Sequence, residues 1–174
     1  MKTSLTVGIL VLALLAFSCQ PQSAALTDAQ KSAIADSVKA VVQEVFIGAQ
    51  KLSGAAFIHR FSSDPDARFV ENGVLYSSPD SVKAGADNLY GMLQSLANPI
   101  DAFDVVVLGA EAASVTAPFH FTVKTKAGKD VKGQGVFSAV VQFRAGRWQI
   151  VQSHESELNL AQVMADMAPP KPKK

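Results

Sequence analysis

Cysteine is nearly absent from the 174-residue chain, which has only Cys19. A single cysteine excludes an internal disulfide framework and any Cys-x-x-Cys metal site. The sequence also has no Gly-x-Ser-x-Gly elbow and no phosphate-binding glycine loop. Nucleophilic catalysis of the common hydrolase type is therefore not predicted, and no cofactor is expected.

Basic residues are also scarce once the chain ends are set aside. The whole chain has 16 Lys and Arg against 15 Asp and Glu. Four of the basic residues lie at positions 2, 171, 173 and 174, which leaves 12 against 15 acidic residues, or about −3. The central segment offers no basic stripe to collect phosphates, so nucleic-acid binding is not predicted.

The N-terminus has the pattern of an export signal. A basic start and a thirteen-residue apolar run from Leu5 to Phe17 precede Cys19, and the run is shorter than the ~20 residues that span a bilayer. The segment 15–19 resembles the lipobox of bacterial lipoprotein signal peptides, although Phe17 is bulkier than usual at its place. The resemblance implies cleavage before Cys19, lipid attachment to its thiol, and anchoring to a membrane with the protein facing the periplasm or cell exterior. An ordinary secretory signal is the alternative.

The remainder is the size of one domain. We expect four segments: a signal peptide at 1–18, a polar tether at 19–25, one folded domain at 26–160, and a Pro- and Lys-rich tail without fixed structure at 161–174.

Local signals predict two long helices. Capping-box spacing at Thr27-x-x-Gln30, followed by apolar residues at steps of three and four, predicts a helix over 28–52. A short helical turn is expected over 55–61. Ser78 offers an N-cap followed by proline, and the apolar spacing after it predicts a second helix over 79–98.

The other regular segments read as antiparallel strands. Asn72-Gly73 is a strong hairpin signal because both residues tolerate positive φ, and it joins strands at 68–71 and 74–77. Bulges or kinks are expected at Pro118, Gly133 and Gly135, where long strands would bend. Further strands are predicted over 104–108, 111–126, 131–144 and 147–158.

Strand pairing decides which side chains face the concave side of the sheet. The two-residue connection Ala145-Gly146 aligns the last two strands with Phe137 opposite His154. In this register Trp148, Gln152 and His154 point inward. No acidic residue of the long strands does so, and the two helices should cover this apolar face.

This order of elements resembles the NTF2-like superfamily, and the sequence is similar to its SnoaL-like and DUF4440 members. The stretches that carry the resemblance are DARFVENG at 66–73, GQGVF at 133–137 and GRWQIVQSH at 146–154. The resemblance implies an α+β fold, a cystatin-like cone in which a curved antiparallel sheet wraps two to three helices. It also implies a small-molecule pocket at the open end, frequent dimerisation through the sheet, and functions that range from isomerase and dehydratase to inert binding or assembly.

Glu71 is the first candidate for catalysis. The resemblance places it where isomerases of the superfamily carry the base that abstracts a proton, and a buried carboxylate there would have a raised pKa. A solvated carboxylate beside the turn is the alternative. Those isomerases carry aspartate there and also use an acid on the sheet, which the predicted inner face lacks.

His154 is the second candidate, as an acid or base near neutral pH, and a core histidine is the alternative. Gln152, Trp148, Phe137, Tyr90 and Arg60 are the further candidates for the pocket, with core packing or plain surface as the alternatives. No metal site is predicted, because the three histidines do not converge.

These observations lead to an expected function and two alternatives. We expect an exported lipoprotein whose domain binds a small apolar or amphipathic ligand without catalysis. The alternatives are a SnoaL-like isomerase, dehydratase or hydrolase that uses Glu71 and His154, and a tethered dimeric interaction module whose cone is filled by its own side chains.

Overall fold

The computed structural model describes residues 25–168. The predicted signal peptide, Cys19, most of the tether and the last six residues lie outside the described residues. Within the described part, no helix is both long and apolar enough to cross a membrane.

The predicted caps set where the two long helices begin. Helix α2 spans Asp28–Gln50, and Thr27 accepts a hydrogen bond from the Gln30 backbone while the Gln30 side chain accepts one from the Thr27 backbone. Helix α3 (Gly54–Phe57) and the 3-10 turn η1 (Ile58–Arg60) follow. Helix α4 spans Pro79–Tyr90 after an N-cap at Ser78.

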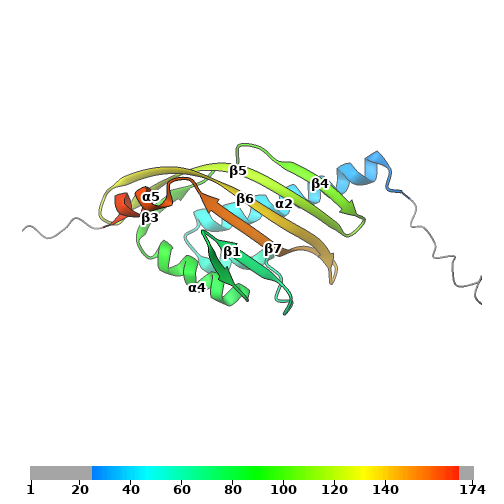
Figure 1. Ribbon diagram of the computed structural model, residues 1–174, viewed down its shortest axis with the longest axis horizontal. Helices are drawn as coiled ribbons and strands as arrows, with labels where there is room; N and C mark the ends of the chain where they lie inside the picture. The colour runs from blue at the N-terminus through cyan, green and yellow to red at the C-terminus, as the bar shows by residue number, and fades with distance from the viewer. Residues whose placement is uncertain (1–24, 169–174) are drawn as a thin grey trace, which may run out of the picture.

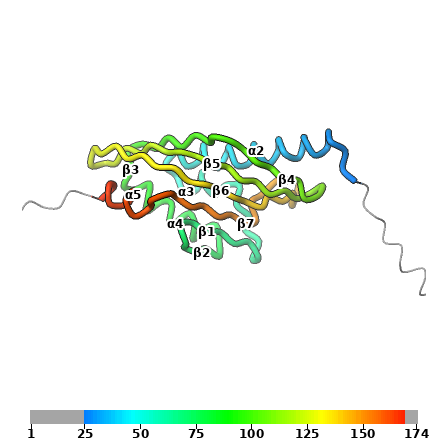
Figure 2. Tube along the Cα trace, turned by 45° about the horizontal axis from the view of Figure 1, so that its top comes forward, coloured from blue at the N-terminus to red at the C-terminus, as the bar shows by residue number. Residues whose placement is uncertain are grey.

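Seven strands form one curved sheet in the order β2-β1-β7-β6-β5-β3, with β4 also paired to β5. Figure 1 shows the long strands β5, β6 and β7 side by side, with α2 along one face. Helix α5 and β3 lie at one end of the molecule, and β4 and the first turn of α2 lie at the other (Figure 2). The bounds are β1 Arg68–Glu71, β2 Val74–Tyr76, β3 Leu93–Ala97, β4 Asp104–Gly109, β5 Ala112–Thr125, β6 Asp130–Arg144 and β7 Arg147–Glu157.

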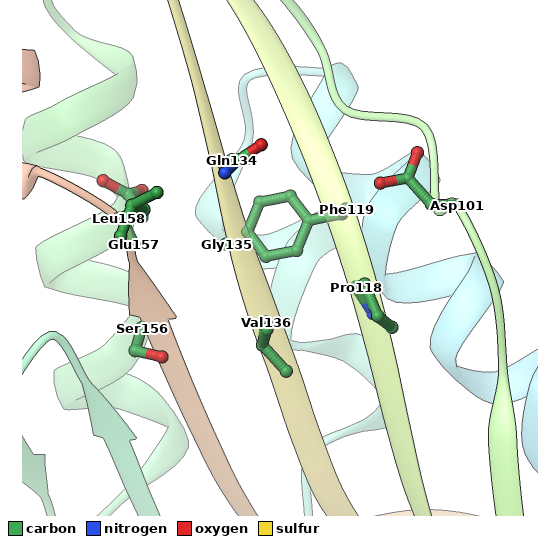
Figure 3. Close-up of a pocket in the computed structure, with 9 residues that line it drawn as sticks. All are labelled: Asp101, Pro118, Phe119, Gln134, Gly135, Val136, Ser156, Glu157 and Leu158. Carbon is green, nitrogen blue, oxygen red and sulfur yellow. The ribbon is translucent and has the colours of Figure 1, made fainter.

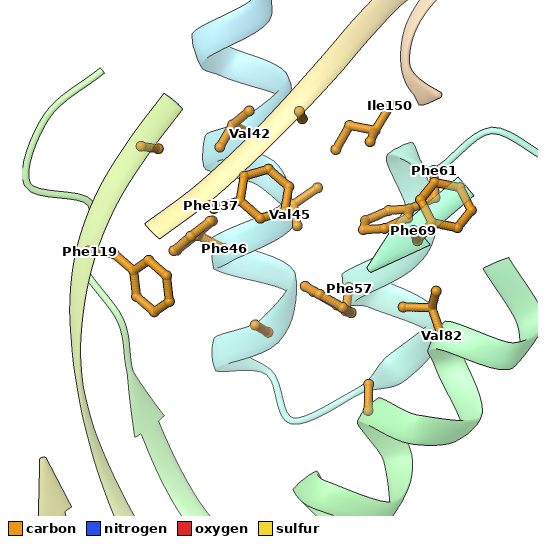
Figure 4. Packing of buried hydrophobic residues seen from close by; sticks show 14 of the residues in the cluster. Val42, Val45, Phe46, Phe57, Phe61, Phe69, Val82, Phe119, Phe137 and Ile150 are labelled. Atoms are coloured by element: carbon orange, nitrogen blue, oxygen red, sulfur yellow. The ribbon is translucent and has the colours of Figure 1, made fainter. Parts of the chain in front are cut away.

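The α+β cone predicted from the sequence is confirmed. The hairpin β1–β2 turns at Asn72-Gly73 with positive φ at both residues. Strand β1 then pairs in parallel with β7, so an early segment of the domain lies beside its last strand. Buried aromatic side chains of α2 and of the sheet fill the space between them, as Phe46 does against Phe119 and Phe137 with ring centroids 5.2 and 5.8 Å away (Figure 4).

Two predicted boundaries are wrong. The second helix ends at Tyr90 rather than at residue 98, because Gly91 caps it and the next segment pairs with β5 as strand β3. Leu93 therefore belongs to the sheet, where it is buried. The tail expected from residue 161 is helical over Leu160–Met167 (α5), because Val163 packs into the core.

No bulge occurs at the three positions where bulges or glycine kinks were expected. Strands β5 and β6 pair without a register shift past Pro118, Gly133 and Gly135. The two glycines instead make room for aromatic rings, since a Cβ at Gly133 would lie 2.2 Å from Cζ of Phe121.

A bulge in β7 decides which side chains of that strand face inward. Val141 pairs with Ile150, but Val140 pairs with Gln152, so Val151 is an extra residue on β7. Every side chain beyond it faces the opposite way from the prediction, and Phe137 pairs with Glu155 instead of His154.

Candidate functional site

An open cavity lies between the concave face of the sheet and the helices. Its volume is about 370 Å³, within the range of small-molecule pockets. Residues from α2, α4 and the sheet form its walls, and α5 contributes four side chains at one side. The apolar lining residues are Phe46, Ala49, Phe57, Val74, Ala86, Leu89, Leu93, Leu96, Phe119, Phe121, Val123, Leu160, Val163, Met164 and Met167.

Three carboxylates gather on one wall of this cavity. Glu71 at the end of β1 pairs directly with Glu155 on the parallel strand β7, so the two side chains are neighbours. Glu157 follows two residues later on the same face of β7. Asn72 fixes this junction, because its side-chain oxygen accepts a hydrogen bond of 2.9 Å from the Glu157 backbone and its N–H donates to the Glu155 carbonyl.

The pKa values of all three carboxyl groups are raised above the ordinary value. Burial raises the pKa of Glu71 to about 7, and repulsion from Glu157 adds to the effect. Burial raises the pKa of Glu155 to about 8, with smaller contributions from Glu71 and Glu157. Burial also raises the pKa of Glu157. In the part of the chain that the structure describes, none of the three has a salt-bridge partner, so protons relieve the repulsion.

Two tyrosines and an asparagine complete the polar lining. Burial raises the pKa of Tyr90, with Glu155 and Glu71 contributing. Burial also raises that of Tyr76, with a further contribution from Glu71. Asn98, which follows β3, is 8% exposed, and its Oδ1 has no hydrogen-bond partner among the described residues.

The structure brings only two of the predicted site residues into this cavity. Glu71 and Tyr90 line it. Because of the bulge at Val151, Gln152 and His154 are exposed on the outer face, so their predicted inward orientation is wrong. Glu71 and His154 therefore do not meet in one cavity.

The other three predicted pocket residues lie elsewhere. Phe137 is buried in the core beside Phe46. Trp148 packs against Phe143 near the β6–β7 turn, with ring centroids 5.6 Å apart. Arg60 is held by Glu44, whose carboxylate accepts from its Nε at 2.6 Å.

Sequence reasoning missed Glu155, Glu157, Asn98 and the apolar side chains of α5. The first two were assigned to the outer face by a register without the bulge. The only sequence signal for them is the run Glu155-Ser156-Glu157, which places two acidic residues at strand spacing.

A second hollow lies on the outer face of the sheet. It is lined by exposed residues such as Gln134, Val136 and Leu158, together with Asp101 (Figure 3). His120 next to it is paired with Asp101, at 2.6 Å between Nδ1 and Oδ1. This hollow shares Glu157 with the inner cavity, but neither Glu71 nor Glu155 lines it.

The inner cavity can therefore hold an apolar body and present acid and base groups to it. Near neutral pH a protonated carboxyl group can donate a hydrogen bond while a neighbouring carboxylate accepts one. Among residues 25–168, no three His, Cys, Asp or Glu side chains are arranged to hold a metal ion.

Replacing Glu155 by Gln should stabilise the protein at high pH. The folded-state pKa of Glu155 lies above its unfolded value, so the folded state loses stability as the pH rises from about 4.5 to about 8. Glu155→Gln removes this loss and should raise the free energy of unfolding at pH 8.5 by about 2 kcal/mol, with little gain at pH 5. Urea unfolding at the two pH values measures the difference. The exposed Glu111→Gln is the matched control, and equal gains at both pH values would contradict the assignment.

Comparisons with known proteins agree with this fold. No curated protein is significantly similar to the chain. Among solved structures, an NTF2-like superfamily protein from Salmonella enterica serovar Typhimurium is 19% identical, with a TM-score of 0.63 over 82% of this chain and 96% of that one. A hexachlorocyclohexane dehydrochlorinase from Novosphingobium barchaimii is 12% identical, with a TM-score of 0.65 over 75% and 90% of the chains. A putative scytalone dehydratase from Novosphingobium aromaticivorans is 8% identical, with a TM-score of 0.69 over 76% and 89%.

The sequence itself matches a family model. The model describes a SnoaL-like domain, and the match covers residues 38–160, from the middle of α2 to the first residue of α5. The family and the structural neighbours point to the same superfamily, and the chain belongs to the SnoaL-like family of NTF2-like proteins.

Proposed function

We propose that the protein binds a small amphipathic organic molecule in the inner cavity, without a chemical step. The observation that carries this proposal is the division of the cavity into an apolar part and one acidic wall formed by Glu71, Glu155 and Glu157. The apolar part of the cavity favours the apolar body of a ligand, because burying that body releases water. The acidic wall orients a polar group of the same ligand. An interaction module with a filled cone is less well supported, because this cavity is open.

A cavity-filling variant tests ligand binding. Leu89 on α4 lines the cavity and is only partly exposed, so Leu89→Trp should occupy its volume and lower the affinity for the neutral fluorescent probe N-phenyl-1-naphthylamine by about tenfold or more. Fluorescence titration measures the dissociation constant. Met92→Trp, at a position that is 45% exposed and does not line the cavity, is the control. Unchanged binding in the folded Leu89→Trp protein would contradict the proposal, as would no binding to the unmodified protein.

Proton-transfer catalysis is a second candidate function, favoured by the direct pairing of Glu71 with Glu155. In this reading Glu71, at the end of β1, is the base, and the protonated Glu155 beside it donates a hydrogen bond to the developing negative charge. The fold is compatible with enzymes, since the similar structures include a dehydrochlorinase and a putative dehydratase. This candidate replaces the predicted pair of Glu71 and His154.

A reactive probe separates the two candidates. The ring opening of 5-nitrobenzisoxazole needs only a base that removes a carbon-bound proton, so a catalytic Glu71 should accelerate it, with a rate that rises through pH 7. Glu71→Gln should lower this rate by about 100-fold, and Glu111→Gln should leave it unchanged. Absorbance of the nitrophenolate product follows the reaction. A rate no higher than that of free acetate at the same concentration would reject a catalytic base.

We also propose that the mature protein is tethered to a membrane through a lipid on Cys19 and faces the periplasm or cell exterior. The support is the apolar run and lipobox-like segment that precede Cys19. A homodimer through the outer face of the sheet is proposed with it, because Val136 and Leu158 are 40% and 56% exposed there. Native mass spectrometry of protein from its own host would report the oligomeric state together with any retained ligand.

Substitution of the cysteine tests the anchor. Cys19→Ser should move the protein from the membrane fraction to the soluble exported fraction, because the thiol that carries the lipid is lost. Fractionation followed by immunoblotting measures the distribution, with Ser23→Ala as a control in the same segment. Continued membrane attachment of the Cys19→Ser protein would contradict the lipid anchor.

A further inference from the structure

The charge of the inner cavity is one-sided. Glu71, Glu155 and Glu157 line it, and no Lys, Arg or His stands among the described residues that do so. Of the other titratable groups on the surrounding elements, Asp87 of α4 is paired with Lys83, and Lys129 donates to backbone carbonyls at the end of α5. Among residues 25–168, no side chain therefore supplies a countercharge to the three carboxylates. An anionic ligand would be repelled by this wall.

A buried, unpaired amide lies across the cavity from the carboxylates. Asn98 follows β3, on the far side of β5 and β6 from β7. It is 8% exposed, it lines the cavity, and its Oδ1 has no hydrogen-bond partner in the described part of the chain. An unpaired buried polar atom of this kind destabilises the folded protein. Asn98 is thus an independent sign of an occupant, to which it offers a hydrogen-bond acceptor at the end of the cavity opposite the carboxylates.

The floor between these two polar regions is aromatic. The rings of Phe119 and Phe121 extend over Gly135 and Gly133 of β6, where a Cβ would lie within 2.8 and 2.2 Å of the ring carbons. Figure 3 shows the Phe119 ring beside Gly135. Because the glycines have no side chains, the apolar floor continues from β7 to β3. A flat or extended apolar body fits between the acidic wall and Asn98.

We propose that the ligand is an organic amine whose ammonium group is bound by Glu71, Glu155 and Glu157, and whose apolar body lies on the aromatic floor toward Asn98. This inference rests on the proposed ligand binding and names its chemical class. An ammonium group supplies the missing countercharge and up to three hydrogen-bond donors to carboxylates, which are acceptors when ionised. A metal ion is a poorer fit, because no three acidic groups of residues 25–168 are arranged to hold one.

Binding of an amine should also release protons. The carboxyl groups are partly protonated near pH 7 because burial raises their pKa values, and an ammonium ion beside them favours the ionised form. Protons therefore pass from the carboxyl groups to the buffer as the amine binds. Tyr76 and Tyr90 are the other titratable groups in the lining. They remain protonated because burial raises their pKa values above the ordinary value of tyrosine, which already lies well above pH 7.

Three matched probes test the inference by isothermal titration calorimetry: 4-phenylbutylamine, 4-phenylbutanol and 4-phenylbutanoate, which share one apolar body. The amine should bind at least about tenfold more tightly than the alcohol, and the carboxylate should bind most weakly. Titrations in buffers of different ionisation enthalpy should show proton release for the amine alone. Glu155→Gln should abolish most of the preference for the amine over the alcohol, while Glu111→Gln should leave that preference unchanged.

The outcomes distinguish this inference from the function on which it rests. Equal affinity for the amine and the alcohol would overturn the amine inference and leave ligand binding intact. An amine preference without proton release, or one unaffected by both Glu155→Gln and Glu71→Gln, would overturn the assignment to the carboxylates. Failure of all three probes and of N-phenyl-1-naphthylamine to bind would overturn the proposed ligand binding as well. The comparison of probes on the unmodified protein does not depend on how the variants fold.

Discussion

The site depends on one extra residue in the last strand. Val151 interrupts the register between β6 and β7, and the alternation of side chains is reversed beyond it. Without this bulge Gln152 and His154 would face the cavity in place of Glu155 and Glu157, and Glu71 would be the one carboxylate of the wall. With it, Glu155 and Glu157 face inward beside Glu71. A single irregularity of the backbone therefore brings two of the three carboxylates into the pocket.

The acidic wall lowers the stability of the folded protein when its carboxyl groups are ionised. Glu71 and Glu155 are paired on adjacent strands in an apolar setting, so both ionise only at the expense of repulsion and lost hydration. Asn72 holds the junction through backbone hydrogen bonds rather than by neutralising the carboxylates. Such an arrangement stabilises the fold less than an apolar wall would, which is the usual relation between a binding site and stability. The amine and acid–base proposals both follow from it.

Local signals predicted the fold well, and the site poorly. The caps at Thr27 and Ser78 and the turn at Asn72-Gly73 act within a few residues, so the sequence shows them directly. The apolar spacing that includes Leu93 predicted a longer helix, but this residue pairs with β5 and belongs to strand β3. The segment from Gln152 to Glu157 contains no apolar residue from which its inward face can be read. The bulge before it is a product of pairing with neighbouring strands, which no local pattern reveals.

The parallel pairing of β1 with β7 has a consequence for how the protein matures. Glu71 and Glu155 come from distant parts of the chain, and five strands and a helix are made between them. The acidic wall cannot exist until the last strand has been delivered and has docked against β1, a contact of long sequence separation that forms slowly. A chain truncated before β7 lacks both Glu155 and Glu157 and therefore lacks the acidic wall. The acidic wall is thus complete only when the whole domain has been made.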